Sequence, residues 1–137
     1  MKTIYLVLAF SFLFLTSCTQ DDNDNNSENN IVNGTWSIRN VSGGIAGINE
    51  DFQEGKMVWG FNRGKLTVTN LETNSFRYGL ENGIYSYKIE KIKDIYFLYI
   101  DNSEFGGINL LKNGFIIDQN ITSNGTGADG FTFKLLE

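Results

Sequence analysis

The chain has 137 residues, of which 11 are basic and 16 acidic, so its formal net charge is −5 at neutral pH. This balance argues against a nucleic-acid-binding surface, because neutralising phosphates requires an excess of lysine and arginine. The sequence has no histidine and a single cysteine, which removes the usual zinc ligands, catalytic bases and nucleophilic triads and leaves no partner for an intrachain disulfide.

The first 18 residues have the pattern of a bacterial secretion signal that ends at a cysteine. Lys2 supplies a positive charge, residues 4–15 are almost entirely apolar, and Leu15-Thr16-Ser17-Cys18 closes the segment. The apolar run is shorter than the ~20 residues that a transmembrane helix needs, and the small residues before the cysteine favour cleavage over an uncleaved N-terminal anchor. This end resembles the lipobox of bacterial lipoproteins, in which lipid is attached to the cysteine thiol. The resemblance implies that residues 1–17 are a signal peptide and that Cys18 carries acyl chains such as palmitate.

Residues 18–30 form the next unit, the lipidated cysteine followed by an acidic, asparagine-rich segment. The stretch 19–30 has no apolar residue, so it cannot bury enough surface to offset its ordering entropy, and we expect a disordered tether. Asp21 and Asp22 lie soon after the cysteine, which is similar to the export signal of Bacteroidota lipoproteins. That resemblance implies anchoring to the outer membrane with exposure at the cell surface, whereas the composition alone indicates only a solvated spacer.

From residue 31 onward, short runs of aromatic and β-branched residues alternate with polar residues, which is typical of strands. Within 34–41, for example, Trp36 and Ile38 share one face, and the Asn113-Gly114 pair predicts a hairpin between two apolar runs. The expected strands are 34–41, 56–62, 65–70, 83–90, 95–101, 107–111, 115–120 and 130–136, with 76–80 as a further short strand or an extension of the next one. We therefore predict one all-β domain over 31–137, an eight-stranded antiparallel meander that closes into a barrel and so has no exposed edge. An open β-sandwich fits the same pattern.

The start of the first strand, Gly34-Thr35-Trp36, is similar to the Gly-x-Trp of lipocalins and the wider calycin barrels. Together with Gly83-Ile84-Tyr85 and the late Gly-Ile-Asn-Leu-Leu run at 107–111, it resembles the lipocalin-like domains of Bacteroidota lipoproteins. The resemblance implies that Trp36 closes the floor of the barrel, that Lys134 on the last strand packs across its indole, and that the barrel binds a small apolar molecule.

The aromatic residues expected to face inward are the candidate ligand-binding residues. They are Trp59, Phe61, Tyr85, Tyr87, Phe131 and Phe133. They line a pocket in one interpretation and fill the barrel completely in the other, since a small barrel has little spare volume. The glycine-rich segment 43–55 is either a lid that turns Ile45, Ile48 and Phe52 toward the interior or a loop that packs outside.

The remaining acidic residues give little support for catalysis. Asp101 and Glu104, like the acids of 50–54, lie in polar turns where charged residues are expected, and Asp129 suits a turn. We therefore predict no enzyme activity, no metal site and no cofactor. The preferred hypothesis is a lipid-anchored cell-envelope protein that holds a small hydrophobic ligand. The alternative is a filled barrel that binds a protein or glycan through its surface, which exposed Tyr96 or Tyr99 would favour. In both, Cys18 attaches the chain to the membrane and nucleic acid is not a partner.

Overall fold

The computed structural model describes residues 25–71 and 79–137. The signal, Cys18 and most of the run 76–80 lie outside these ranges. Two short helical segments come first, α1 (Asn25–Glu28) and η1 (Asn29–Val32). The strands that follow are β1 (Gly34–Gly43), β2 (Ile48–Asp51), β3 (Met57–Asn62), β4 (Lys65–Asn70), β5 (Gly83–Ile92), β6 (Ile95–Ile100), β7 (Ser103–Leu111), β8 (Gly114–Asp118), β9 (Ile121–Thr122), β10 (Gly125–Thr126) and β11 (Phe131–Leu136).

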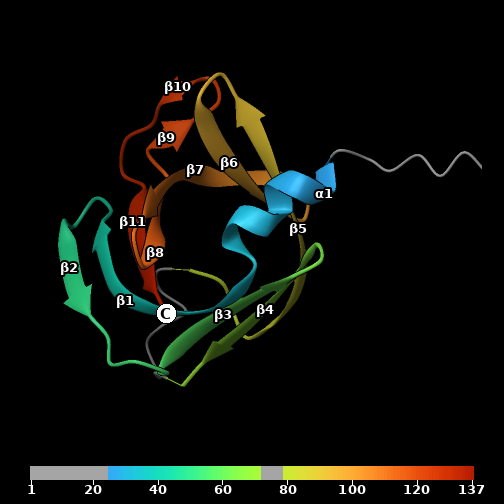
Figure 1. The fold of residues 1–137 in the computed structure, drawn as a ribbon. Coiled ribbons are helices and arrows are strands. Elements are labelled where there is room, and N and C mark those ends of the chain that lie inside the picture. The colour runs from blue at the N-terminus through green and yellow to red at the C-terminus, as the bar shows by residue number, and fades with distance from the viewer. Residues whose placement is uncertain (1–24, 72–78) are drawn as a thin grey trace, which may run out of the picture.

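Eight of these strands close into an antiparallel barrel (Figure 1). Strands β3 to β8 pair each with the next, β8 pairs with β11, and β11 pairs with β1 from Ser37↔Leu136 to Gly43↔Phe131. The other edge of β1 is shared, because residues 34–37 pair with β3 and residues 40–43 pair with β2. This closure confirms the predicted meander and excludes the open sandwich.

The alternation of the sequence explains which face of each strand is buried. In β4, for example, Leu66 and Val68 are buried while Lys65, Thr67 and Thr69 are exposed, as the two-residue period of a strand requires. The same pattern in the other strands sends one continuous apolar cluster into the barrel. Its buried members are Val32, Ile38, Val41, Met57, Trp59, Phe61, Leu66, Val68, Tyr87, Ile89, Leu98, Ile100, Ile108, Phe115, Ile117, Phe133 and Leu135.

The N-terminal segment α1–η1 closes one end of the barrel, where it crosses the opening in Figure 1. Val32 is fully buried in the core. The Asn29 side-chain oxygen accepts a hydrogen bond from the backbone N–H of Ile89 at 2.8 Å, and a Glu28 carboxylate oxygen accepts one from the N–H of Lys91 at 3.2 Å. Residues 25–30, which the sequence assigns to the tether, are helical in the structure, and the side chains of Glu28 and Asn29 accept hydrogen bonds from backbone donors of β5.

The barrel has two different ends. The closed end carries α1–η1, the turns at 62–65, 92–95 and 111–114, and Glu137. The far end carries β2, the turn at 100–103 and the long connection 118–131 with β9 and β10. The residues of β9 pack on the outside of β7, since a Cβ added at Gly107 would lie 2.6 Å from a methyl carbon of Ile121.

Segment 43–55 forms a hairpin with β1. Strand β2 pairs with the last residues of β1, Asn40↔Asp51 to Gly43↔Ile48. Ile45 is 89% exposed, so it does not turn inward as the lid hypothesis required. Ile48 and Phe52 are half-buried and pack against the core cluster, because they lie on the strand and its exit and Ile45 lies at the turn.

Candidate binding site

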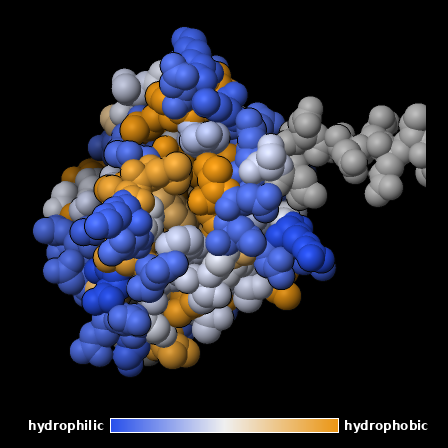
Figure 2. Space-filling model, in the orientation of Figure 1, coloured by the Kyte–Doolittle hydropathy of each residue, from blue (hydrophilic) through white to orange (hydrophobic). Residues whose placement is uncertain are grey.

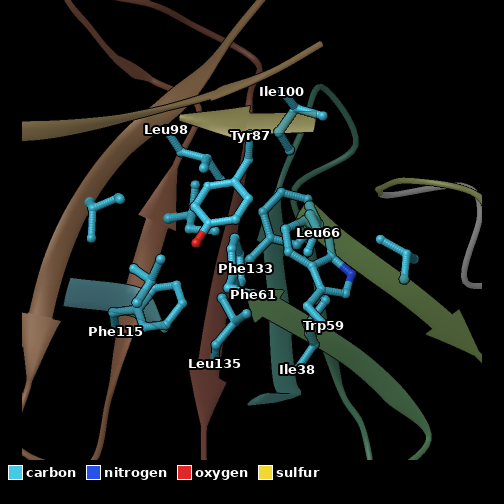
Figure 3. Packing of buried hydrophobic residues seen from close by; sticks show 14 of the residues in the cluster. Ile38, Trp59, Phe61, Leu66, Tyr87, Leu98, Ile100, Phe115, Phe133 and Leu135 are labelled. Carbon is cyan, nitrogen blue, oxygen red and sulfur yellow. The ribbon is translucent and has the colours of Figure 1, made fainter. Parts of the chain in front are cut away.

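Four of the six predicted ligand-binding residues lie at the centre of the core (Figure 3). Trp59, Phe61, Tyr87 and Phe133 come from β3, β5 and β11 and are buried. The Phe61 ring lies 5.0 Å from Tyr87 and 6.3 Å from Trp59 between centroids. The Trp59 and Phe133 rings are 5.8 Å apart. These are the separations of aromatic rings in direct contact, so the four side chains pack against one another and fill the space between the strands.

Phe115 completes this cluster, although it was not among the candidate residues. Its ring is 5.9 Å from Phe61 and 5.2 Å from Trp36, both in edge-to-face orientation. The alternation of Phe115 with Ile117 in β8 gives the signal that could have found it, since both are buried.

Tyr85 and Phe131 lie at the margins of the core. Tyr85 is half-buried and its hydroxyl donates to the Glu81 carbonyl oxygen at 2.9 Å. Phe131 is also half-buried, with its ring 6.4 Å from Phe133. The structure therefore gathers four of the six predicted residues in the core and places the other two at its edge.

Phe105 joins the far end of the cluster, and the sequence pattern did not reveal it. Its ring lies 5.7 Å from Trp59 and 5.6 Å from Phe133. The pairing of β6 with β7 shifts register beside it, because Leu98 pairs with Gly106 and Tyr99 with Glu104. A β-bulge of this kind breaks the two-residue period, so alternation alone could not assign Phe105 to a face.

Two of these rings carry polar atoms into the core. The Tyr87 hydroxyl donates a long hydrogen bond of 3.5 Å to the Asn29 carbonyl oxygen, and burial raises the pKa of Tyr87 above its ordinary value. The Trp59 indole nitrogen is buried and has no hydrogen-bond partner among the described residues. An unpaired buried N–H is costly. The side-chain oxygen of Asn70, at the end of β4, is likewise buried without a partner in the described ranges, so each of these two atoms is a polar point that a bound group could satisfy.

Among the hollows on the surface of the described residues, three differ in volume and lining residues. The largest, about 470 Å³, is lined by Asn33, Gly34, Thr35, Val58, Gly60, Phe61, Asn62, Thr67 and Thr69. A second of about 300 Å³ lies beside the bulge, lined by Glu104, Phe105, Gly106, Gln119, Thr122 and Asn124. A third of about 210 Å³ is at the closed end, lined by Ile31, Trp36, Leu110, Leu111, Lys112, Asn113, Gly114 and Glu137. Phe61 is the only predicted ligand-binding residue that lines any of the three.

The largest hollow is a groove on the outer wall of the barrel, and Gly60 explains its shape. Thr35, Gly60 and Thr67 lie side by side on β1, β3 and β4. Because Gly60 has no side chain, the wall is depressed between the two threonines, and the nearest atom to a Cβ placed there would be 3.9 Å away. Val58 and Asn62 continue the groove along β3.

Trp36 and Lys134 do not form the contact that the lipocalin resemblance implied. The Trp36 indole N–H donates to the Val32 carbonyl oxygen at 2.7 Å, and its ring meets Phe115, so it does lie at the closed end. Lys134 is exposed between buried Phe133 and Leu135. The alternation of β11 directs it to the outer surface, and the expected packing of its ammonium group across the indole is wrong.

The acidic residues of the far end act in hydrogen bonds that hold turns. Glu104 accepts from the Ser123 N–H at 2.7 Å and from its hydroxyl at 2.5 Å, while Asp101 accepts from the Ser86 N–H at 2.9 Å. Tyr99 is half-buried on the outer wall, and its hydroxyl donates to Glu104 at 3.4 Å. The described residues contain no cluster of potential metal-binding side chains.

Tyr96 is half-buried and packs against the core, with the Lys91 ammonium 5.4 Å from its ring centre.

In the described part of the chain, no helix is long and apolar enough to cross a membrane. Comparisons with protein-family models, with curated proteins and with solved structures find no match. The closed eight-stranded barrel is consistent with a calycin-like fold.

Proposed function

We propose that this chain is a lipid-anchored cell-envelope protein that binds its partner through the outer surface of a filled barrel. The packing of Trp59, Phe61, Tyr87 and Phe133 at ring-contact distances carries this proposal. An interior ligand would have to displace these side chains, each of which makes the favourable contacts of a close-packed core. The alternative from the sequence thus becomes the preferred function.

The anchoring part of the proposal comes from the sequence. Cys18 and the segment before it have the lipobox pattern, and acidic residues follow it. The chain is thereby attached by its acyl groups to the outer membrane, with the barrel on the outside of the cell. It works by binding and uses neither a metal nor a cofactor.

The groove centred on Gly60 is the candidate surface for the partner. Hydroxyl and amide groups from Thr35, Thr67 and Asn62 line it, and Val58 supplies an apolar contact. The polar groups of a ligand site fix the orientation of its ligand, and most side chains that line this groove carry a hydroxyl or an amide: Asn33, Thr35, Asn62, Thr67 and Thr69. A glycan or an extended peptide matches this chemistry, whereas a compact apolar molecule does not.

A second candidate, a small apolar ligand at the far end, is favoured by the orphaned Trp59 nitrogen. The half-buried rings of Phe105 and Phe131 lie beside Trp59 or Phe133 at this end. A ligand that bears one hydrogen-bond acceptor would satisfy the indole N–H while its apolar part replaces one of these rings. The barrel with its buried aromatic cluster is consistent with such a role.

One pair of measurements separates the two candidates. Native mass spectrometry of the full chain purified from bacterial envelopes should show no retained small molecule if the barrel is filled. A reproducible adduct that disappears in a Trp59→Phe variant would instead establish the apolar ligand.

Binding of the wild type to arrays of oligosaccharides and peptides then tests the groove. A Cβ at Gly60 would meet no atom closer than 3.9 Å, so Gly60→Val places its side chain in the depression and should reduce binding at least tenfold. Asn109→Val, an exposed change on β7 away from the groove, is the matched control. Equal binding by both variants would overturn the groove as the binding surface.

A further inference from the structure

The chain enters the barrel at its closed end. Cys18 lies seven positions before Asn25, where α1 begins, and a fully extended segment of this length spans at most roughly 25 Å. A strand of six residues covers about 20 Å, so the far end lies about that much farther from the point of attachment. Attachment at Cys18 thus lets the closed end reach the membrane, and the chemistry of the two ends decides which of them touches lipid.

Large apolar side chains are partly exposed at this end. Leu110 is 47% exposed and Leu111 37%, and both line the hollow of about 210 Å³ beside Ile31 and Trp36. Ile95, in the adjacent turn, is 43% exposed. In Figure 2 hydrophobic surface gathers near the centre of this view, surrounded by hydrophilic side chains. Such a combination marks an interaction surface.

The charges of the described residues are divided between the two ends. The exposed basic residues of the closed end are Arg63, Lys65, Lys91, Lys93 and Lys112, beside the acids Glu28, Asp94 and Glu137. The acids of the far end are Glu50, Asp51, Glu54, Glu81, Asp101, Glu104, Asp118 and Asp129, with Lys56 and the Glu54-paired Arg39 as bases. Lys88, Glu90 and Lys134 lie between the two ends. Although the protein is acidic overall, most of its exposed basic residues lie at the closed end, where the chain leads toward Cys18.

We propose that the closed end is a membrane-docking surface, on which Leu110 and Leu111 enter the headgroup region while lysines such as Lys112 pair with phospholipid phosphates. The proposal rests on the lipidation of Cys18. Each lysine close to an anionic surface favours the docked orientation by about fivefold, and the apolar side chains add the gain from leaving water. The acidic far end is held away from the negatively charged membrane, while the outer-wall groove runs from Asn62 at the closed end along the wall to Thr69.

Single-cysteine labelling tests this orientation, because Cys18 is the only thiol of the natural sequence and lipid blocks it. A polarity-sensitive fluorophore is attached at Lys112→Cys on the closed end, or at Asn124→Cys on the far end as control. Both sites are exposed. The lipidated proteins are placed in vesicles of phosphatidylglycerol and phosphatidylethanolamine that contain a nitroxide-bearing lipid. We expect quenching and a blue-shifted emission at position 112 only. Equal quenching at both positions, or quenching at neither, overturns the docking surface.

A charge variant provides a second readout. Lys93→Glu should lower the ratio of docked to undocked barrels at least about fivefold, measured by the quenching at position 112. Lys56→Glu, at the far end, should leave that quenching unchanged. If the two variants behave alike, the lysines do not hold the closed end to the lipid.

The anchor is checked separately by intact mass and by flotation of the protein with vesicles. A chain without lipid at Cys18 overturns the anchoring and the docking together. A lipidated chain without selective quenching overturns the docking alone. Crosslinking between two labelled closed ends, without quenching, would show that a second copy covers this surface and would likewise overturn the membrane assignment.

Discussion

Replacement of Phe61 by alanine tests directly whether the barrel is filled. The Phe61 ring is buried and contacts Trp59, Tyr87 and Phe115. Losing its transfer free energy costs about 2 kcal/mol. The roughly 100 Å³ vacated by the ring adds about 2.4 kcal/mol at ~24 cal/mol per Å³. We therefore expect Phe61→Ala to lower the free energy of unfolding by about 4 kcal/mol.

Urea unfolding followed by far-ultraviolet circular dichroism measures this loss, with Ile84→Ala as the control. Ile84 lies on the exposed face of β5, so its truncation should cost less than about 0.5 kcal/mol. The vacated volume should also bind benzene, which would raise the melting temperature of Phe61→Ala and leave that of the wild type unchanged. A loss below about 1.5 kcal/mol, or stabilisation of the wild type by benzene, would refute the reasoning because it would mean that the natural interior is already hollow.

Three further substitutions probe other contacts. Asn29→Ala leaves the N–H of Ile89 without its acceptor and should cost about 1–3 kcal/mol in urea unfolding; no loss would show that the closing segment does not stabilise β5. Burial raises the pKa of Tyr87, so the unfolded chain loses this proton first and stability should fall as the pH rises above about 10. Tyr87→Phe should show a shallower alkaline fall in melting temperature, and identical slopes would contradict the shift. Glu104→Ala removes the acceptor of two Ser123 hydrogen bonds and should speed amide exchange at Ser123, whereas unchanged exchange would mean that other contacts hold the turn.

The strands of this barrel follow from local chemistry, and the sequence predicted them accordingly. Alternation placed Trp59 and Phe61 on one face of 56–62, and the structure buries both. The Asn113-Gly114 hairpin joins β7 to β8 as expected, and Gly114 has the positive φ of +154° that suits glycine. Closure was also predictable, because the first and last strands would otherwise be unpaired edges.

What the sequence missed depends on contacts between distant segments. Asn29 has no apolar neighbour on its N-terminal side that would suggest order, yet its side chain reaches β5, sixty positions away, to accept a hydrogen bond. The sequence also left open whether segment 43–55 is a lid or an outer loop. It pairs with β1 because β3 pairs with β1 only as far as Ser37, and the same edge of β1 is free beyond that residue. The composition of such segments shows that they are polar. It cannot predict their hydrogen-bond partners, because those partners are brought close only when the barrel has folded.

The closing segment links the core to the proposed orientation at the membrane. Val32 is buried in the barrel, and its carbonyl oxygen accepts the Trp36 indole hydrogen bond. The end of η1 is therefore fixed to the core. Docking of a surface costs less when the elements that present it are already ordered. Because Ile31 lines the same hollow as Leu110 and Leu111, the packing that seals the barrel also shapes the apolar surface proposed to meet lipid. In the proposed orientation, a barrel filled in this way has no interior binding site and presents a rigid end to the membrane, so its partner would bind on the outer wall.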